Sequence, residues 1–212
     1  MLDGKEGLAR LVESEGIGPR VVAAFRAVAR ADFVPEASRP DAYEDRPIEI
    51  LERQTRSQPS LIARMIDAAD VLPGDRILEV GTGFGYQTAL IAALGAEVVS
   101  VDRYSSIAEA ARANLEAAGI EAEIVVGDGW QGWPARAPYD AIVVSAAASE
   151  VPPALGEQLA DAGRLVIPVR AGRGDEVLVF VKQHGRLVKA RLLTPARFVP
   201  LIPGALGDQS NE

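Results

Sequence analysis

The 212-residue sequence contains no cysteine and only one histidine, His184. The absence of cysteine excludes disulfides, thiolate nucleophiles, iron–sulfur clusters and zinc–thiolate sites. A single histidine excludes a two-histidine metal site, and a Ser–His–Asp triad would have to use His184, which lies in a stretch of turn-like composition. We therefore expect a protein without a metal site.

The sequence also lacks long apolar runs and an excess of positive charge. No run approaches the roughly 18 apolar residues of a membrane-spanning helix. Residues 1–16 are charged and lack the apolar region of a signal peptide. Acidic residues outnumber basic ones by 30 to 22, and the net charge of −8 argues against a phosphate-backbone partner. These features predict a cytoplasmic protein that binds neither a membrane nor nucleic acid, and we expect a monomer.

The length predicts a single domain, 1–212, at ~150 residues per domain. Its first segment, 1–72, is helical and rich in loops. Apolar residues recur at helical spacing on both sides of 16–19, where glycine and proline interrupt the pattern. Three prolines make 30–55 irregular, and a helix is expected to begin at Pro59.

The second segment, 73–170, alternates short apolar runs with alanine-rich helical stretches. Expected strands cover 76–80, 98–102, 124–128, 141–145 and 165–169. Expected helices lie near 87–94, 106–118 (with Ser106 and Glu109 as a capping box) and 153–160. This alternation predicts an α/β fold with a doubly wound, mostly parallel sheet. In the third segment, 171–212, the runs 176–182 and 187–193 predict an antiparallel β-hairpin followed by a tail.

The most informative stretch is the glycine-rich loop after the first predicted core strand, with Gly81, Gly83 and Gly85. Glycines there let the backbone turn sharply beside a ligand, while the following helix offers free N–H groups. The spacing is G-x-G-x-G, whereas dinucleotide sites use G-x-G-x-x-G. The shorter form is typical of S-adenosylmethionine sites, although a plain tight turn has the same composition.

Acidic residues at three predicted strand ends strengthen the cofactor hypothesis. Asp102 ends the second strand about 20 residues after Gly81, where a carboxylate can accept hydrogen bonds from ribose hydroxyls; it could also cap a helix. The stretch 127–129, Gly-Asp-Gly, lies where an adenine edge would lie, or forms a plain turn. Glu79, inside a buried run, is expected to hydrogen-bond the loop or the ligand. Three carboxylates suit a ligand with an ammonium and a sulfonium better than a pyrophosphate.

Several further motifs follow one another along nearly the whole chain. They are FVP at 33–35, AYEDRP at 42–47, QTRSQP at 54–59, LPGDRILEVGTGFGY at 72–86, VGDG at 126–129, GWP at 132–134, APYD at 137–140, GRLVIPV at 163–169 and RFVPL at 197–201. Together they resemble the protein-L-isoaspartate O-methyltransferase family of class I methyltransferases. The GTGFGY segment marks the superfamily, and AYEDRP and QTRSQP are specific to this family.

The resemblance implies an S-adenosyl-L-methionine-dependent repair enzyme, with S-adenosyl-L-homocysteine as product. Such an enzyme esterifies the free carboxylate of isoaspartyl residues formed when Asn or Asp ages. The family's catalytic serine falls on Ser57. We expect cofactor contacts from Glu79, Gly81, Thr82, Gly83, Gly85, Tyr86, Asp102, Arg103, Gly127, Asp128 and Gly129. Substrate-side residues are expected to be Thr55, Arg56, Gln58, Ala146 and Ala147.

The residue inventory suits this chemistry. A carboxylate with an ordinary pKa near ~3.9 reaches the enzyme as an anion and needs no general base. Methyl transfer is then an in-line displacement, in which positioning can supply on the order of 7–11 kcal/mol. A serine hydroxyl that hydrogen-bonds the attacking carboxylate is sufficient. Ser57 lies two residues before Pro59, however, and could also help to cap the helix there.

The sequence departs from the family pattern beside Ser57, where Glu52, Arg53 and Arg56 stand in place of small or apolar groups. A related enzyme that methylates a different Asp-containing peptide or a small acid is therefore the alternative function. A nicotinamide-dependent oxidoreductase and a cofactor-binding protein without catalysis are more distant alternatives.

Other side chains have two interpretations each. Trp130, Trp133 and Tyr139 suit packing better than a substrate wall. Tyr86 suits packing and the cofactor pocket about equally, and the pair Glu44 and Asp45 suits either a loop surface or a lid over the cofactor.

Overall fold

The structure, a computed structural model, describes residues 4–49, 51, 55–56 and 58–204. Its helices are α1 (Gly4–Ser14), α2 (Pro19–Ala27), α3 (Pro59–Ala69), α4 (Tyr86–Ala93), α5 (Ser105–Ala117) and α6 (Pro153–Gln158). Its strands are β1 (Ile48–Glu49), β2 (Thr55–Arg56), β3 (Arg76–Val80), β4 (Glu97–Asp102), β5 (Glu123–Val126), β6 (Tyr139–Val144), β7 (Leu159–Ala171), β8 (Gly174–Gln183) and β9 (Arg186–Ala196). Short 3₁₀ helices are η1 (Arg30–Phe33), η2 (Glu36–Asp41) and η4 (Pro134–Arg136).

Strands β3 to β9 form one seven-stranded sheet with the order β5-β4-β3-β6-β7-β8-β9. The first five strands in this order are parallel, and β8 and β9 are antiparallel to their neighbours. The predicted α/β fold with a doubly wound, mostly parallel sheet is therefore confirmed. The C-terminal part contains two consecutive hairpins, β7–β8 and β8–β9, because β7 continues to Ala171 before the chain turns back.

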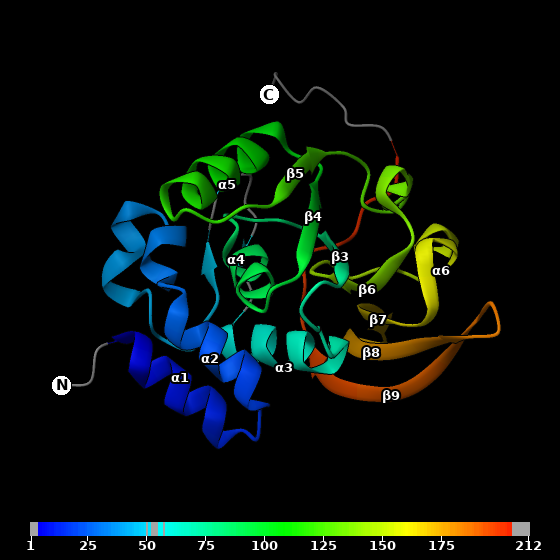
Figure 1. Ribbon diagram of the computed structural model, residues 1–212, viewed down its shortest axis with the longest axis horizontal. Coiled ribbons are helices and arrows are strands. Elements are labelled where there is room, and N and C mark those ends of the chain that lie inside the picture. Colours follow the sequence, from blue (N-terminus) through cyan, green and yellow to red (C-terminus); the bar gives the residue numbers. More distant parts are fainter. Residues whose placement is uncertain (1–3, 50, 52–54, 57, 205–212) are drawn as a thin grey trace.

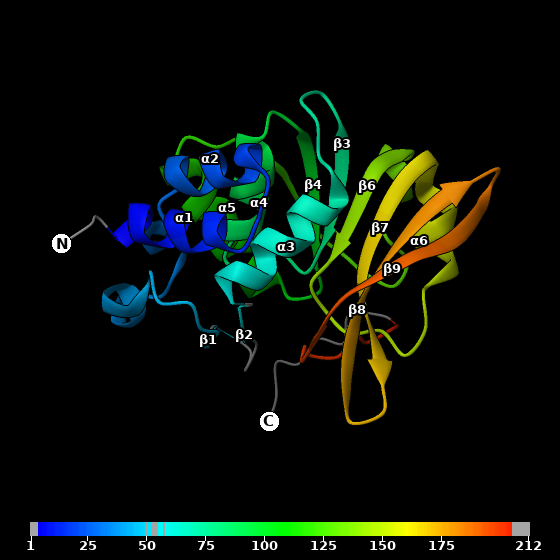
Figure 2. The ribbon, with the colours of Figure 1, turned by 90° about the horizontal axis from the view of Figure 1, so that it is seen from below.

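Helices cover the two faces of the sheet unequally, as Figures 1 and 2 show. One face packs against α1 to α5 in a continuous apolar cluster that includes Ile77 and Val98 from the strands. The other face, with Leu78 and Val80, packs against α6 and the loop that carries Trp130. Successive side chains of a strand point to opposite faces, so Glu79 points to the same face as Ile77, toward α4.

Most predicted elements lie within a few residues of the observed ones, and two details of the prediction are wrong. Helix α5 begins at Ser105 with Tyr104 as its N-cap and has no side-chain capping bond, so Ser106 lies inside the helix and no capping box forms. Strand β7 begins at Leu159, because the helix before it ends at Gln158. The turn between β8 and β9 matches the prediction, with positive φ at His184 and Gly185.

The segment between α2 and α3 is irregular, as its prolines predict. Its described residues form short 3₁₀ helices and the two-residue strands β1 and β2. In the described part of the chain, no helix has the length and apolarity that a membrane span requires.

Candidate active site

A pocket opens at the carboxyl ends of β3, β4 and β6. The order of these strands places β3 in the middle, and both β4 and β6 pair with it. Successive strands are added on opposite sides of β3, since β4 and β5 extend to one side and β6 and β7 to the other. Ligands of doubly wound sheets bind outside the strand ends at such a switch point. The fold therefore places the pocket where the sequence predicted a cofactor.

The loop between β3 and α4 forms one wall of the pocket and depends on glycine at two positions. Gly81 has a φ of 94°, and a Cβ atom there would lie 3.3 Å from the Cβ of Ser145. Gly85, the N-cap of α4, has a φ of 91° and would approach Leu115 to 3.2 Å. A side chain at either position would be strained and would crowd its neighbours. The loop can thus lie close to both the sheet and a ligand.

Asp102 ends β4 and lies at the edge of the pocket. Its carboxylate accepts hydrogen bonds from the backbone N–H of Gly83, at 3.2 Å, and of Tyr104, at 3.1 Å. Burial raises the pKa of Asp102, while hydrogen bonds from backbone amides lower it. The side chain stabilises the loop and lines the pocket at once, so the capping and ligand-binding interpretations are compatible.

Glu79 lies behind the loop and is completely buried. Its Oε2 accepts hydrogen bonds from the hydroxyls of Thr88 and Ser100, and the Ser100 hydroxyl lies 2.7 Å from that of Thr82. Its Oε1 has no partner among the described residues. Burial raises the pKa of Glu79 to about 7, against the lowering effect of these hydrogen bonds. Glu79 therefore supports the loop from below and does not line the pocket.

A segment far along the chain, 199–202, forms another wall of the pocket. It runs beside Ala147, whose N–H donates to the carbonyl of Val199 at 2.8 Å, and Leu201 donates back to Ala147. Arg103 donates to the carbonyl of Ile202 at 3.1 Å, and Asp128 accepts from the N–H of Gly204 at 2.9 Å. Two residues predicted as cofactor ligands, Arg103 and Asp128, thus hold this segment in place.

The structure divides the predicted site residues into three groups. Those that line the pocket are Gly81, Thr82, Gly83, Tyr86, Asp102, Arg103, Gly129 and Ala146. Those that do not line it are Gln58, Glu79, Gly85, Gly127, Asp128 and Ala147. Thr55 and Arg56 form β2, whereas Ser57 lies outside the described residues. The catalytic role of Ser57 stays a prediction.

Sequence reasoning missed several residues that line the pocket, among them Ile62, Gln87, Tyr104, Ile107 and Ser145. The amide of Gln87 donates to the hydroxyl of Ser145 at 3.1 Å. Gln87 begins the predicted helix after the glycine loop, and Ser145 ends a predicted strand. Their positions at the ends of predicted elements, next to the predicted cofactor site, could have indicated that they line the pocket.

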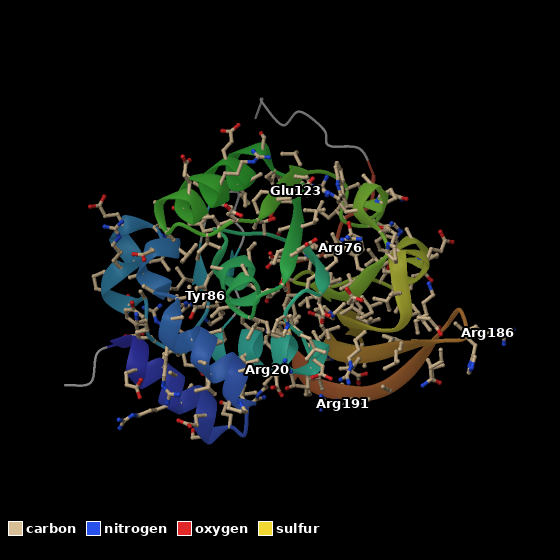
Figure 3. All side chains as sticks on the ribbon, in the orientation of Figure 1. Arg20, Arg76, Tyr86, Glu123, Arg186 and Arg191 are labelled. Atoms are coloured by element: carbon tan, nitrogen blue, oxygen red, sulfur yellow. The ribbon has the colours of Figure 1, made fainter. Side chains whose placement is uncertain are left out.

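Tyr86 illustrates how packing and pocket lining coincide. It is buried, with a relative exposure of 1%, and lies between α4 and the N-terminal helices (Figure 3). Its ring contacts those of Phe25 and Phe33, both with centroids 6.0 Å away. The same residue lines the pocket, so both interpretations of Tyr86 hold. Tyr139, by contrast, belongs to the apolar cluster on the other face of the sheet, and Trp130 and Trp133 pack against that cluster. The Tyr139 hydroxyl donates to the Trp133 carbonyl.

Comparisons with known proteins agree with this geometry. The family model for protein-L-isoaspartate(D-aspartate) O-methyltransferase matches residues 5–205. A protein-L-isoaspartate O-methyltransferase from Methanoculleus marisnigri is 50% identical over 90% of this chain and 87% of its own. Its counterpart from Methylorubrum extorquens is 44% identical, covering 95% of this chain and 91% of its own.

Solved structures give the same result. A structure named protein-L-isoaspartate O-methyltransferase superposes with a TM-score of 0.84 at 32% identity, covering 96% of this chain and 67% of the other. A Plasmodium falciparum structure described as the same enzyme, in complex with S-adenosyl-L-homocysteine, has a TM-score of 0.83 at 25% identity, covering 94% of this chain and 99% of its own. By sequence and by structure, the chain belongs to the protein-L-isoaspartate(D-aspartate) O-methyltransferase family.

Proposed function

We propose that this protein transfers a methyl group from S-adenosyl-L-methionine to the free carboxylate of L-isoaspartyl residues in damaged proteins or peptides. The observation that carries the proposal is the pocket at the carboxyl ends of β3 and β4, lined by the glycine loop and Asp102, in a chain that belongs to this family over 5–205. The curated relatives bear the name of this activity, which favours it over methylation of another Asp-containing peptide or a small acid.

The polar groups that line the pocket fit S-adenosyl-L-methionine better than a dinucleotide. The N–H of Gly83 already donates to the Asp102 carboxylate, so this amide is not free to bind a phosphate. The Asp102 carboxylate can accept hydrogen bonds from ribose hydroxyls. We assign Asp102 and the loop 81–85 to cofactor binding. When bound, the cofactor supplies an electrophilic methyl group on a positively charged sulfur.

The residues that hold the acceptor are proposed to lie in 42–60, which we call the acceptor segment. Because the acceptor carboxylate is already an anion, the protein needs to orient it and exclude water, without removing a proton. We propose that the Ser57 hydroxyl donates a hydrogen bond to this carboxylate, with Thr55, Arg56, Gln58, Ala146 and Ala147 nearby. Ala146 lines the pocket at the end of β6, which supports this arrangement.

The experiment is a methylation assay with labelled S-adenosyl-L-methionine and two peptides that differ only in one linkage. One peptide contains an L-isoaspartyl residue and the other contains a normal aspartyl residue at the same position. We expect methyl ester to form on the isoaspartyl peptide and to stay at background on the aspartyl control. Equal labelling of both peptides, or of neither, would contradict the proposed substrate.

We also propose that the protein acts as a cytoplasmic monomer without a nucleic-acid partner. The net charge of −8 supports the last point, since it disfavours contact with phosphate backbones. Size-exclusion chromatography with light scattering tests the oligomeric state, and a dimer mass would overturn that part of the proposal.

A further inference from the structure

We propose that Arg30 and Asp45 are positioning residues that fix the acceptor segment against the start of α3. This inference rests on the proposed function, because it assigns a role to residues on the acceptor side of the same site. It is carried by two sets of hydrogen bonds that connect parts of the chain far apart in sequence.

The first set joins Asp45 to the N-terminus of α3. The N-cap residue of this helix, Gln58, makes no capping bond with its own side chain. Asp45 takes that role: Oδ1 accepts from the N–H of Ser60 at 2.9 Å, and Oδ2 accepts from the Ser60 hydroxyl at 2.9 Å and from the Gln58 amide at 2.6 Å. A carboxylate is favourable here because helix N-termini carry free N–H groups and partial positive charge.

The second set holds Asp45 itself. The guanidinium of Arg30 donates to the carbonyls of Ala42, at 2.9 Å, Glu44, at 2.8 Å, and Arg46, at 3.2 Å. Two of these carbonyls belong to the direct neighbours of Asp45. A rigid planar fork can hold several carbonyls at fixed positions, which a lysine ammonium cannot do in the same way. Arg30 thereby determines where the Asp45 carboxylate points.

Burying the charge of Arg30 costs free energy, and the need to fill space in the interior does not explain why an arginine is buried here. The side chain has a relative exposure of 0%, and its burial lowers its pKa. Within the described ranges it forms no ion pair, and its Nε has no hydrogen-bond partner. Burying a charge without a charged partner is unfavourable, so an apolar side chain would fill this space at lower cost. The contacts to the carbonyls are what an apolar residue cannot provide.

Arg30 also touches the pocket side. Its guanidinium carbon lies 6.0 Å from the ring centroid of Tyr86, which lines the pocket. Helix α3 reaches the pocket as well, through Ile62. In Figure 2 the short strands β1 and β2 lie beside the start of α3. Arg30 and Asp45 therefore connect the pocket wall to the beginning of α3, directly after position 57.

The test compares two Asp→Asn variants at opposite ends of α3. Asp45→Asn keeps the size of the side chain but replaces one carboxylate oxygen with a donor. Asp70→Asn makes the same chemical change at the C-cap of α3, where Asp70 has a φ of 55° and pairs with Arg164 at 2.8 Å. For Asp45→Asn we expect kcat/KM for an isoaspartyl peptide to fall at least 10-fold, while the Kd of S-adenosyl-L-homocysteine stays within twofold. For Asp70→Asn we expect neither value to change.

Two further measurements separate positioning from general stability. Hydrogen exchange should show faster exchange of the amides of Ser60, Leu61 and Ile62 in Asp45→Asn and not in Asp70→Asn. Arg30→Lys keeps the charge but not the fork, and we expect the same selective loss of kcat/KM. An Asp45→Asn enzyme with unchanged kcat/KM and exchange would overturn the inference, as would a parallel loss of cofactor affinity.

The outcomes also distinguish this inference from the proposed function. If the wild-type protein leaves the isoaspartyl peptide unmethylated, the proposed substrate is wrong. The exchange experiment then still decides whether Asp45 fixes the start of α3, because unchanged exchange at 60–62 contradicts this role of Asp45 directly. If Arg30→Lys fails to fold, the Asp45→Asn measurements are sufficient to support or overturn the inference.

Discussion

The cofactor pocket and the acceptor segment are built in different ways. The pocket uses the ends of adjacent parallel strands and one glycine loop, so about half of its lining residues lie in two short stretches, 80–87 and 101–104. In its described part, the acceptor segment has the two-residue strands β1 and β2 as regular structure before α3. It is held by Arg30 and Asp45 through contacts that span 12 to 16 positions in sequence.

The sheet determines the positions of the main cofactor-side residues, whereas individual side chains determine the position of the acceptor segment. The parallel register pairs Val80 of β3 with Val101 of β4, so the next residues, Gly81 and Asp102, lie side by side. This placement does not depend on surface side chains. The acceptor segment, in contrast, depends on a few polar contacts from individual side chains. Substitutions on the cofactor side should therefore change cofactor affinity or stability, and substitutions on the acceptor side should change reactions with the peptide.

The largest expected effect is on turnover, from Ser57→Ala. If the hydroxyl orients the attacking carboxylate, its loss should lower kcat by about 100-fold, since small misplacements of reacting groups have effects of this size. Calorimetry should show an unchanged Kd for S-adenosyl-L-homocysteine. Ser14→Ala, on the surface of α1, is the matched control. A Ser57→Ala enzyme with wild-type turnover would remove the proposed catalytic role.

The second effect concerns Glu79 and pH. Its pKa is about 7 in the folded protein and near the ordinary value of 4.5 when unfolded. The folded state therefore binds more protons between these values. The stabilisation from Glu79 is fully present below pH ~4.5 and is lost as pH rises through about 7.

Glu79→Gln removes this titration. Relative to the wild type, the variant's free energy of unfolding should rise by ~2.5 kcal/mol between pH 5 and pH 8.5. Chemical denaturation at both pH values measures this difference. A difference between the two proteins that does not change with pH would show that Glu79 stays ionised in the folded state.

The third effect is on cofactor affinity. Asp102→Ala should weaken binding of S-adenosyl-L-homocysteine by ~1–3 kcal/mol, because hydrogen bonds to a charged acceptor are lost. The KM for an isoaspartyl peptide should stay close to the wild-type value. Asp75→Ala is a suitable control, because Asp75 lies just before β3, at the opposite edge of the sheet, where its carboxylate accepts from the N–H of Leu72. A change confined to the peptide KM would contradict the separation of the two regions.

The smallest effect should come from Arg103→Ala. It removes one exposed hydrogen bond to the carbonyl of Ile202, worth about 0.5–1.5 kcal/mol. We expect S-adenosyl-L-homocysteine to dissociate two- to fivefold faster in stopped-flow experiments, with the peptide KM unchanged. Arg39→Ala, on the exposed surface of η2, serves as control. An unchanged dissociation rate would show that the wall at 199–202 does not depend on this contact.

The sequence predicted the cofactor side better than the acceptor side, for a physical reason. Hydrophobic periodicity and the spacing of Gly81, Gly83 and Gly85 are local features, and they predicted β3, the loop and α4 closely. The wall at 199–202 is held by a hydrogen bond from Arg103 to the carbonyl of Ile202, which lies 99 positions later in the sequence. No local pattern indicates such a pairing.

The same limit applies to side-chain roles. Asp45 was expected to belong to a loop surface or a lid, and its capping of α3 from that loop was not foreseen. Glu79 was expected to bind the loop or the ligand, and its hydroxyl partners come from α4 and β4. Its position in β3 was predictable, but its partners depend on which helix covers that face of the sheet.

A crystal structure of the protein with S-adenosyl-L-homocysteine would show directly where the cofactor lies. We predict that the nucleoside occupies the pocket at the ends of β3 and β4, with its ribose hydroxyls within hydrogen-bond distance of the Asp102 carboxylate. A nucleoside bound elsewhere, or bound here with its ribose away from Asp102, would overturn the assignment of this pocket.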